Sequence, residues 1–542
     1  MSISRPRKLV AALAVFPLLF AGFIGAANAQ TAGPGAANTE TPTGEWNQHQ
    51  IDVERKGSIT VHKYKNPTKE PGKPTGKEII FKEGLGEPLD GVKFKITPVK
   101  KSNGKKYDFT KDTDILEISK LQASDIVTFS TGEWKEPNRK GGNTKEGVTR
   151  SGTHKFDQLP VDVYLVQETE SPAGTIQAVP FLAIIPTTDP ENLNEWMYDL
   201  EVYPKNYTLD VTKSVKDAEK HEGDEITYTV KTDVPVAKED EDINFYIVKD
   251  QLNTNGANTG YNKESVKSVK LIKKDGGQEK KSFTSQNKDY NVQISTGADG
   301  VRNHGLTVDF QPKALKEISK LSRNKKEPLQ VEVTIALKIS KDANKSKGIV
   351  NTATLFTKPF NDSNLVKKPS PPVTSYFGKI KLVKHDADKK GLRLQGAAFD
   401  IYQCTREDVS NAPKLGKKLF DDQQHRRFVT DQNGEITFPV VHVNNFADNA
   451  VVKDSLKSGY CLVETEAPKG YELRQEPVFV NVAKTNASGE TIEAKVTVPN
   501  VKSFVPKLPL TGGTGIAAII LLAGAIVAIA LFWLRKRTSD SQ

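Results

Sequence analysis

The feature that most constrains the fold of this chain is a pattern of short alternating segments that occurs twice. Residues 57–63 and residues 378–384 both place apolar side chains at every second position. The same order of further segments follows each of them: residues 89–94 match residues 394–399, and residues 164–174 match residues 460–470. Alternation at period two predicts strands with one buried face, so the repeat predicts two copies of one β-domain.

The segment between the two copies has different landmarks but the same alternation. Residues 225–230, 329–337 and 350–355 predict strands, and residues 314–321 are the best candidate for a short helix. A length of 542 residues predicts three to four domains. We therefore predict an all-β protein of three tandem immunoglobulin-like β-sandwiches, over residues 51–206, 207–372 and 373–503, with a mobile arm at 30–50 and a stiff Pro-rich linker within 358–372.

Both ends of the chain carry apolar runs. Basic residues precede an apolar run that ends in Ala27-Asn28-Ala29, so residues 1–29 are predicted to be a cleaved signal peptide. Residues 516–534 contain no charge and are long enough to cross a bilayer. The basic residues 535–537 follow directly, which places that end in the cytoplasm and the body of the chain outside the cell.

Several function classes are disfavoured by composition. The net charge is +10, but lysines alternate with acids instead of gathering with stacking aromatics, which argues against nucleic-acid binding. The eight histidines are dispersed, and residues 239–242 lack EF-hand spacing, so no metal site is predicted. A Gly-rich phosphate loop and a nucleophile elbow are both missing from the sequence. We therefore expect no cofactor, and we expect that the protein is not an enzyme.

The two cysteines, Cys404 and Cys461, fall on two predicted strands of the third domain. An exported chain meets an oxidising environment, which favours a disulfide over a pair of free thiols. No histidine is positioned by the sequence to activate either thiol, so catalysis by these cysteines is not expected.

A sorting motif lies between the third domain and the apolar run, in the segment 504–542. Leu508-Pro509-Leu510-Thr511-Gly512 resembles the LPXTG signal that sortases read on Gram-positive cell surfaces. The resemblance implies that a sortase cysteine attacks the Thr511 carbonyl, releases Gly512 onward, and passes the acyl group to an amine. A simple membrane anchor is the alternative reading of this end.

Two further segments resemble motifs of the Gram-positive sortase-assembled major pilins. Residues 196–205 resemble the pilin motif, with Leu200 where valine is usual, and residues 460–471 resemble the E-box. The resemblance spans the whole chain and implies Cna-B-type sandwiches. It also implies that Lys205 of one subunit is joined to Thr511 of another. The implied partners are other copies of the chain, pilus-specific and housekeeping sortases, minor and tip pilins, peptidoglycan, and a host or bacterial receptor.

Each domain also offers a set for an internal Lys–Asn isopeptide bond. In the third domain the set is Lys384, Glu464 and Asn500; in the second, by their context in the family, it is Lys213, Asp250 and Asn351. Burial is expected to lower the lysine pKa and raise that of the acid, so that a neutral amine attacks an amide polarised by a neutral acid. The alternative for each set is a buried salt bridge or a group of surface residues.

For the first domain, the internal repeat predicts a third set. Lys63 aligns with Lys384, Glu168 with Glu464, and Asn206 with Asn500. Alternation along the last strand would point Lys205 outward and Asn206 inward. The E-box is degraded here, and first-domain bonds are often missing in the family, so the bond and an ordinary buried ion pair both stay open.

These features together predict the structural shaft subunit of a secreted, cell-wall-anchored pilus. The alternatives are a wall-anchored monomeric adhesin that binds host matrix or other bacteria, and a surface enzyme. The adhesin would make no covalent polymer, and the enzyme lacks an active-site pattern in the sequence.

Overall fold

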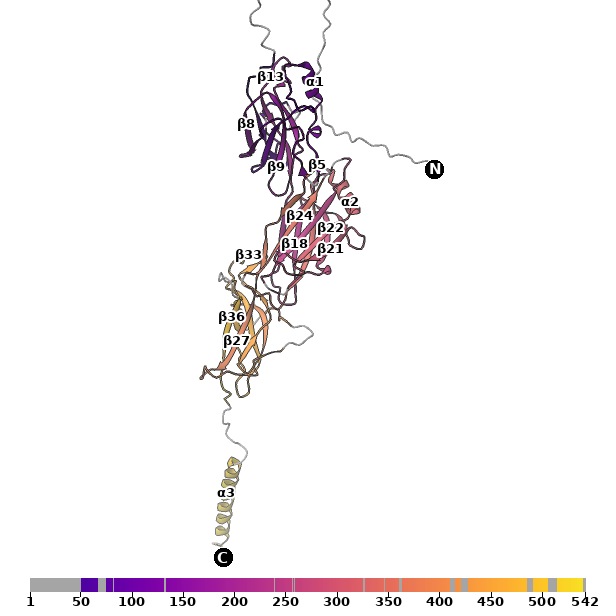
Figure 1. Ribbon diagram of the computed structural model, residues 1–542. Helices are drawn as coiled ribbons and strands as arrows, with labels where there is room; N and C mark the ends of the chain where they lie inside the picture. Colours follow the sequence, from indigo (N-terminus) through magenta and orange to yellow (C-terminus); the bar gives the residue numbers. More distant parts are fainter. Residues whose placement is uncertain are drawn as a thin grey trace, which may run out of the picture. The chain divides into compact units, whose positions relative to one another are not determined.

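The computed structural model of the protein describes residues 50–504, except for short gaps, and residues 514–539 (Figure 1). The gaps are residues 67–74, 81, 131–132, 238, 256, 258, 325–326, 346, 360–362, 410–414, 421–426 and 485–490. The predicted signal peptide, nearly all of the arm at 30–50, and the segment Leu508 to Gly512 lie outside the described residues. The described chain divides into two compact units, one up to Phe377 and one with most residues from Gly378 onward.

The first sandwich, in the first unit, contains the strands of the predicted pilin motif. One set of strands has the order β14-β1-β8 and another β10-β15-β2-β3. A four-stranded sheet has the order β11-β9-β4-β7. The bounds are β1 (Gly57–His62), β2 (Tyr64–Lys65), β3 (Glu87–Pro88), β4 (Lys93–Pro98), β7 (Lys145–Val148), β8 (Thr153–Leu159), β9 (Asp162–Glu170), β10 (Thr175–Ile176), β11 (Phe181–Ile185), β14 (Asp199–Val202) and β15 (Lys205–Thr208). The first strand β1 pairs in parallel with the late strand β14, so the beginning and the end of this domain's sequence lie side by side.

Strand β9 is buried on both faces because two hydrophobic clusters flank it. Tyr164 and Val166 pack into the main core, whereas Val163 and Leu165 pack into a second cluster. Ile118 from helix α1 (Asp112–Lys120) belongs to this second cluster. The sequence analysis did not predict α1, since the helix buries only Asp114 and Ile118 and its apolar stripe is short.

The second sandwich, also in the first unit, has two large antiparallel sheets. Their orders are β16-β17-β23-β19-β20 and β21-β22-β18-β24-β25, with β26 also paired to β24. The bounds are β16 (Val211–Lys216), β17 (Glu225–Asp233), β18 (Phe245–Asn253), β19 (Val266–Lys273), β20 (Glu279–Phe283), β21 (Tyr290–Ser295), β22 (Gly305–Phe310), β23 (Leu329–Lys338), β24 (Ile349–Lys358), β25 (Val366–Pro369) and β26 (Val373–Ser375). Buried residues alternate along β18 and β24, as period two predicts. Helix α2 (Pro312–Ser322) contains the predicted short helix.

The predicted linker at 358–372 is wrong. Within this range, Val366–Pro369 form β25, which pairs with β24. Directly after it, Val373–Ser375 form β26, which also pairs with β24. Proline is tolerated at sheet edges, where its missing N–H breaks no ladder. The Pro-rich composition therefore marks edge strands of the second sandwich.

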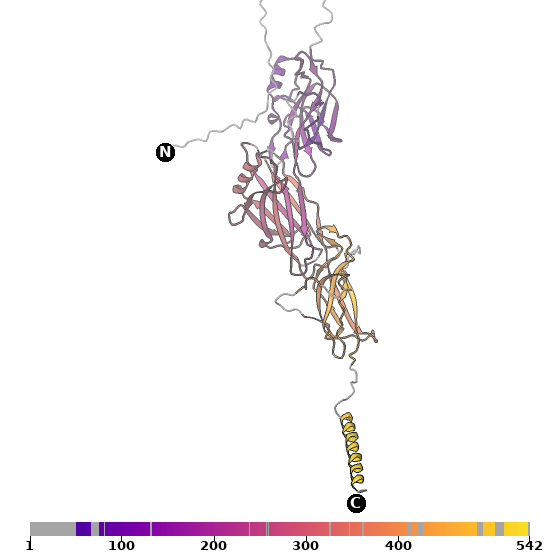
Figure 2. The same ribbon diagram turned by 180° about the vertical axis from the view of Figure 1, so that it is seen from behind.

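The third sandwich makes up most of the second unit. One sheet has the order β30-β27-β31 with β36 also paired to β27, and the other has the order β29-β28-β34-β35. The bounds are β27 (Phe377–Asp386), β28 (Ala398–Thr405), β29 (Phe428–Val429), β30 (Glu435–Thr437), β31 (Val441–His442), β34 (Ser458–Glu466), β35 (Val478–Val480) and β36 (Glu493–Asn500). The first strand β27 and the last strand β36 run parallel, as β1 and β14 do. Figure 2 shows the strands from the opposite side.

A disulfide joins Cys404 on β28 to Cys461 on β34, two paired strands of the third sandwich. This confirms the predicted pairing. The disulfide joins two cysteines that are 57 residues apart in the sequence.

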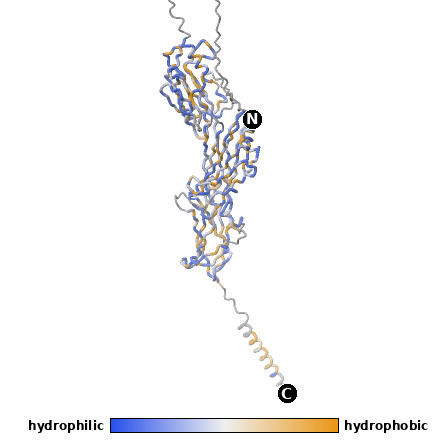
Figure 3. The backbone as a smooth tube through the Cα atoms, turned by 45° about the vertical axis from the view of Figure 1, so that its right-hand side comes forward, coloured by the Kyte–Doolittle hydropathy of each residue, from blue (hydrophilic) through white to orange (hydrophobic). Residues whose placement is uncertain are grey.

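Helix α3 (Thr514–Ser539) is the C-terminal element. Its stretch Ile519–Lys536 has a mean hydropathy of 2.1 and is long and apolar enough to cross a membrane. The hydrophobic colouring of this helix is plain in Figure 3.

Candidate functional sites

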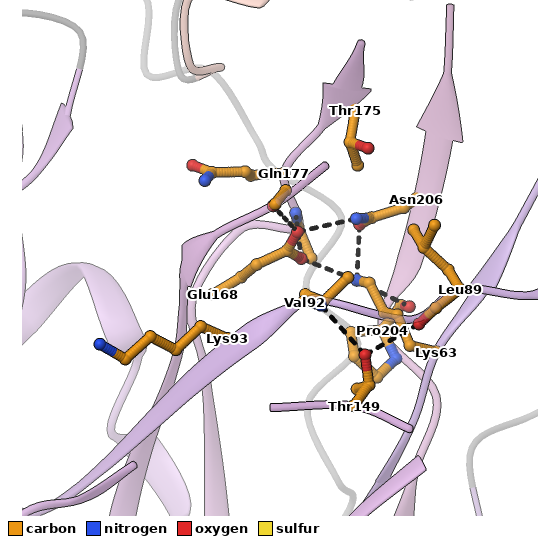
Figure 4. A network of polar contacts seen from close by, with 12 residues as sticks. Lys63, Leu89, Val92, Lys93, Thr149, Glu168, Thr175, Gln177, Pro204 and Asn206 are labelled. Carbon is orange, nitrogen blue, oxygen red and sulfur yellow. Dashed lines mark hydrogen bonds and ion pairs between the residues drawn. The ribbon is translucent and has the colours of Figure 1, made fainter. Parts of the chain in front are cut away.

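The first sandwich buries a lysine, an acid and an asparagine in mutual contact (Figure 4). Lys63 follows β1, where inward positions alternate from Ile59 through Val61, and it is 0% exposed. Its Nζ donates to Asn206 Oδ1 at 2.5 Å and lies 2.7 Å from Glu168 Oε2. Asn206 Nδ2 donates to Glu168 Oε1 at 2.8 Å, so the three side chains form a closed triangle of polar contacts.

A β-bulge sets the position of the acid in this site. The register between β4 and β9 shifts between Lys93 and Phe94, which leaves Phe94 opposite Glu168. The Phe94 ring centroid lies 5.3 Å from Lys63 Nζ, so the face of this ring is an apolar neighbour of the amine. A bulge of this kind redirects a side chain, and here it aims the carboxylate inward.

The third sandwich repeats this arrangement with Lys384, Glu464 and Asn500. Lys384 Nζ donates to Asn500 Oδ1 and lies 3.0 Å from Glu464 Oε1. Asn500 Nδ2 donates to the same Glu464 Oε1 at 3.0 Å. The register of β28 and β34 shifts between Ala398 and Phe399, and the Phe399 ring centroid lies 5.1 Å from the amine. The two bulges and their phenylalanines are therefore part of the internal repeat.

Burial dominates the electrostatics of these lysines. Desolvation lowers the pKa of Lys63 and of Lys384, and the nearby glutamates oppose that shift only in part. A lowered pKa raises the fraction of neutral amine, which is the nucleophilic form. Each site thus holds an activated amine against a carboxamide that is hydrogen-bonded to a carboxyl group.

The middle sandwich connects its predicted set differently. Lys213 Nζ forms an ion pair with Asp250, and both side chains are 0% exposed. Asp250 Oδ1 accepts a hydrogen bond from the Tyr261 hydroxyl at 2.5 Å. Asn351 Nδ2 donates to that same hydroxyl at 2.9 Å. Tyr228 contributes the ring beneath the amine, with its centroid 4.8 Å from Lys213 Nζ.

All three predicted sets are therefore buried, but their aromatic neighbours were missed by the sequence analysis. Phe94 and Phe399 stand at equivalent places in the repeat, in residues 89–94 and 394–399, so that signal was available. Tyr261 follows no strand pattern and lies in irregular backbone before the short 3-10 helix Lys263–Ser265. Nothing in the sequence distinguishes it from other tyrosines of the chain.

The predicted pilin motif forms strands beside the first site. Residues Trp196–Met197 form β13, and β14 and β15 complete the segment. The backbone of Lys205 pairs with Tyr64 on β2, and the orientation of the Lys205 side chain lies outside the described part of the structure. Within the motif, the Tyr203 ring stacks on the ring of His62 at a centroid distance of 4.5 Å. Strand pairing and stacking thus fix the backbone that leads to Lys205.

These features define a class of protein with tandem β-sandwiches in which a lysine, an acid and an asparagine are buried together near the sandwich ends. Comparison with known proteins identifies two of its domains: residues 54–207 match the N-terminal domain of the Gram-positive pilin subunit, D1, and residues 378–497 match the prealbumin-like fold domain. Residues 54–207 therefore belong to the Gram-positive pilin subunits, and the chain as a whole is similar to major pilins.

Relatives of full length support this assignment. The chain is 27% identical to fimbrial subunit type 2 of Actinomyces naeslundii over 98% of both chains. It is also 27% identical to fimbrial subunit type 1 of Actinomyces viscosus, over 93% of this chain and 95% of that one. The structure of the full-length major pilin SpaD from Corynebacterium diphtheriae matches with a TM-score of 0.62 and 28% identity, over 85% of this chain and 100% of that one.

Proposed function

We propose that the chain forms the shaft of a covalent, cell-wall-anchored pilus. A sortase joins Thr511 of one copy to Lys205 of another, and a sortase also attaches the assembled polymer to peptidoglycan. The observation that supports this best is the pilin motif, in which Lys205 begins the paired strand β15 immediately before the buried Asn206. The fimbrial names of the end-to-end relatives point the same way.

Each subunit would also be linked internally. The neutral lysine amine attacks the asparagine Cγ, a new C–N bond forms, and Nδ2 leaves as ammonia. The proposed bonds are Lys63 to Asn206, Lys213 to Asn351, and Lys384 to Asn500. The closed contact triangles of the first and third sandwiches support this chemistry, because they hold amine, amide and acid together. Glu168, Asp250 and Glu464 would move the protons.

The polymer is tested by replacing the attacking amine. We expect Lys205→Ala to abolish high-mass ladders in wall extracts while monomer stays attached to the wall. The matched control is Lys65→Ala, which removes a partly exposed lysine from β2, the strand that pairs with β15. If ladders persist in Lys205→Ala, the linkage through Lys205 is refuted. The monomeric adhesin would then lack support too, because it would make no covalent polymer.

The internal bonds are tested by mass. Each bond expels one ammonia, so the chain loses about 17 Da for each bond. We expect cross-linked peptides that contain Lys63 with Asn206, Lys213 with Asn351, and Lys384 with Asn500. A first sandwich without its cross-link, beside linked second and third sandwiches, would reduce the Lys63 site to a buried ion pair.

A further inference from the structure

The middle site differs from the other two in how the acid reaches the amide. Glu168 and Glu464 each accept a hydrogen bond directly from the asparagine Nδ2. Aspartate is one methylene shorter, and in the middle sandwich Asn351 Nδ2 donates to the Tyr261 hydroxyl. That hydroxyl in turn contacts Asp250 Oδ1. A phenol therefore occupies the place where the other two sites have a carboxylate oxygen.

The surroundings of Tyr261 match this bridging role. Tyr261 is 2% exposed and Asp250 and Asn351 are 0% exposed, so bulk water does not separate the three groups. Burial raises the pKa of the Tyr261 hydroxyl well above its usual value, and the Asp250 charge acts in the same direction. The phenol thus keeps its proton at neutral pH and has one to give. Within the described residues, Asn351 Oδ1 is buried without a hydrogen-bond partner.

We propose that Tyr261 is a fourth catalytic residue of the middle sandwich, a proton relay between Asp250 and the departing nitrogen of Asn351. The inference depends on the proposed Lys213–Asn351 bond and adds a residue to its chemistry. The first and third sites need no such relay, because their glutamates contact the amide themselves.

The relay balances in protons. The reaction starts from a neutral Lys213 amine and a protonated Asp250. The amine attacks Asn351 Cγ and gives one proton to Asp250 Oδ2, the oxygen that it faces. With Asp250 protonated on Oδ1, the two hydrogen bonds of the structure reverse: Oδ1–H donates to the Tyr261 oxygen, and the Tyr261 O–H turns toward Nδ2, which can accept once attack has made it pyramidal. Asp250 then passes the proton on Oδ1 to the Tyr261 oxygen, and Tyr261 passes its own to Nδ2, which leaves as ammonia. The products are the amide, ammonia, and an Asp250 and a Tyr261 that each carry one proton as before.

The test is Tyr261→Phe in the full-length chain, produced in a host without sortases and followed by peptide mapping at intervals after a labelling pulse. General acid–base catalysis is worth 10² or more, so we expect closure of Lys213 to Asn351 to slow about 100-fold. The bonds in the first and third sandwiches serve as internal controls and should form normally. Tyr290→Phe is the matched control, because Tyr290 is a buried tyrosine of the same sandwich on β21, a strand that carries none of the reacting groups.

A second variant separates catalysis from packing. Asp250→Glu, added to Tyr261→Phe, lengthens the acid so that it can reach the amide as Glu168 and Glu464 do, and we expect it to restore closure. Fluorinated tyrosine at position 261 keeps the ring and hydroxyl but changes the acidity of the phenol, so the closure rate should change without loss of fold.

Three outcomes would overturn the relay. These are wild-type closure in Tyr261→Phe, equal loss in Tyr290→Phe, and a closure rate that is unchanged with the fluorinated residue. A wild-type chain with linked first and third sandwiches but an unlinked middle one would instead refute the proposed bond itself.

Discussion

At the scale of single residues, burial decides which groups are chemically useful. Asp162 at the start of β9 is 8% exposed, and burial raises the pKa of its carboxyl group from 3.8 to about 6. The backbone N–H of Val163 donates to it at 2.9 Å and offsets only part of that cost. The folded state therefore binds the Asp162 proton more tightly than the unfolded state does.

This gives a prediction for pH. Because the folded-state pKa is raised, Asp162 costs stability as pH rises from about 4 to about 6, and the cost stays above that range. Asp162→Asn should raise the free energy of unfolding of the first sandwich by about 1–3 kcal/mol at pH 8 and by little at pH 4. Denaturant unfolding at both pH values measures this, with the exposed Asp157→Asn as control. An Asn variant that gains nothing at pH 8 would contradict the prediction.

Where the chain repeats itself, the sequence pattern predicts residues that the structure brings into contact. Lys63, Glu168 and Asn206 were assigned by alignment with Lys384, Glu464 and Asn500, and the structure brings each set into contact. Tyr261 was missed because its role depends on the reach of an aspartate side chain. Such a distance appears only once the strands are packed.

At the scale of elements, the disulfide between β28 and β34 stabilises the third sandwich. A cross-link over 57 residues removes denatured-state entropy worth up to about 4 kcal/mol in the chain-entropy model. We expect reduction to lower the free energy of unfolding of the third sandwich by up to this amount in an Asn500→Ala background, where no isopeptide bond already restrains the chain. The transition of the second sandwich, which contains no cysteine, is the control. A third-sandwich transition that is unchanged by reductant would contradict the prediction.

Elements were predicted well where one face is buried and poorly elsewhere. The alternation in residues 225–230 and 350–355 gave β17 and β24 directly, because side chains in a half-buried strand repeat every second residue. Helix α1 buries too few residues to leave such a signal. The edge strand β25 was interpreted as a linker, since proline and lysine are typical of both exposed edges and linkers.

At the scale of the whole molecule, the proposed bonds determine where a fibre can stretch. Pull would enter at Lys205 and leave at Thr511, so tension would pass through the second and third sandwiches and largely bypass the first. The Lys213–Asn351 and Lys384–Asn500 bonds would then remove residues 214–350 and 385–499 from the loaded path. Residues 206–212, 352–383 and 501–510 would carry the load, and the middle stretch includes the paired strands β25 and β26.

Force spectroscopy tests this load path. A chain held at Lys205 and Thr511 should show no long unfolding extension in either sandwich. Asn351→Ala should add one event of about 137 residues, or roughly 45 nm of contour length. Asn291→Ala, which changes an exposed asparagine on β21, should add none. A long extension in the unmodified chain would refute the load path.

The disulfide also determines what happens to a chain whose backbone is cut. Cys404 and Cys461 enclose residues 405–460, so proteolysis at a single site between them leaves two fragments joined through β28 and β34. A nicked subunit would keep its place in the fibre and migrate as one species. In an Asn500→Ala background, which lacks the proposed isopeptide bond, a reductant would separate the two fragments. The third sandwich could therefore accumulate surface damage outside the cell without breaking the continuity of the polymer.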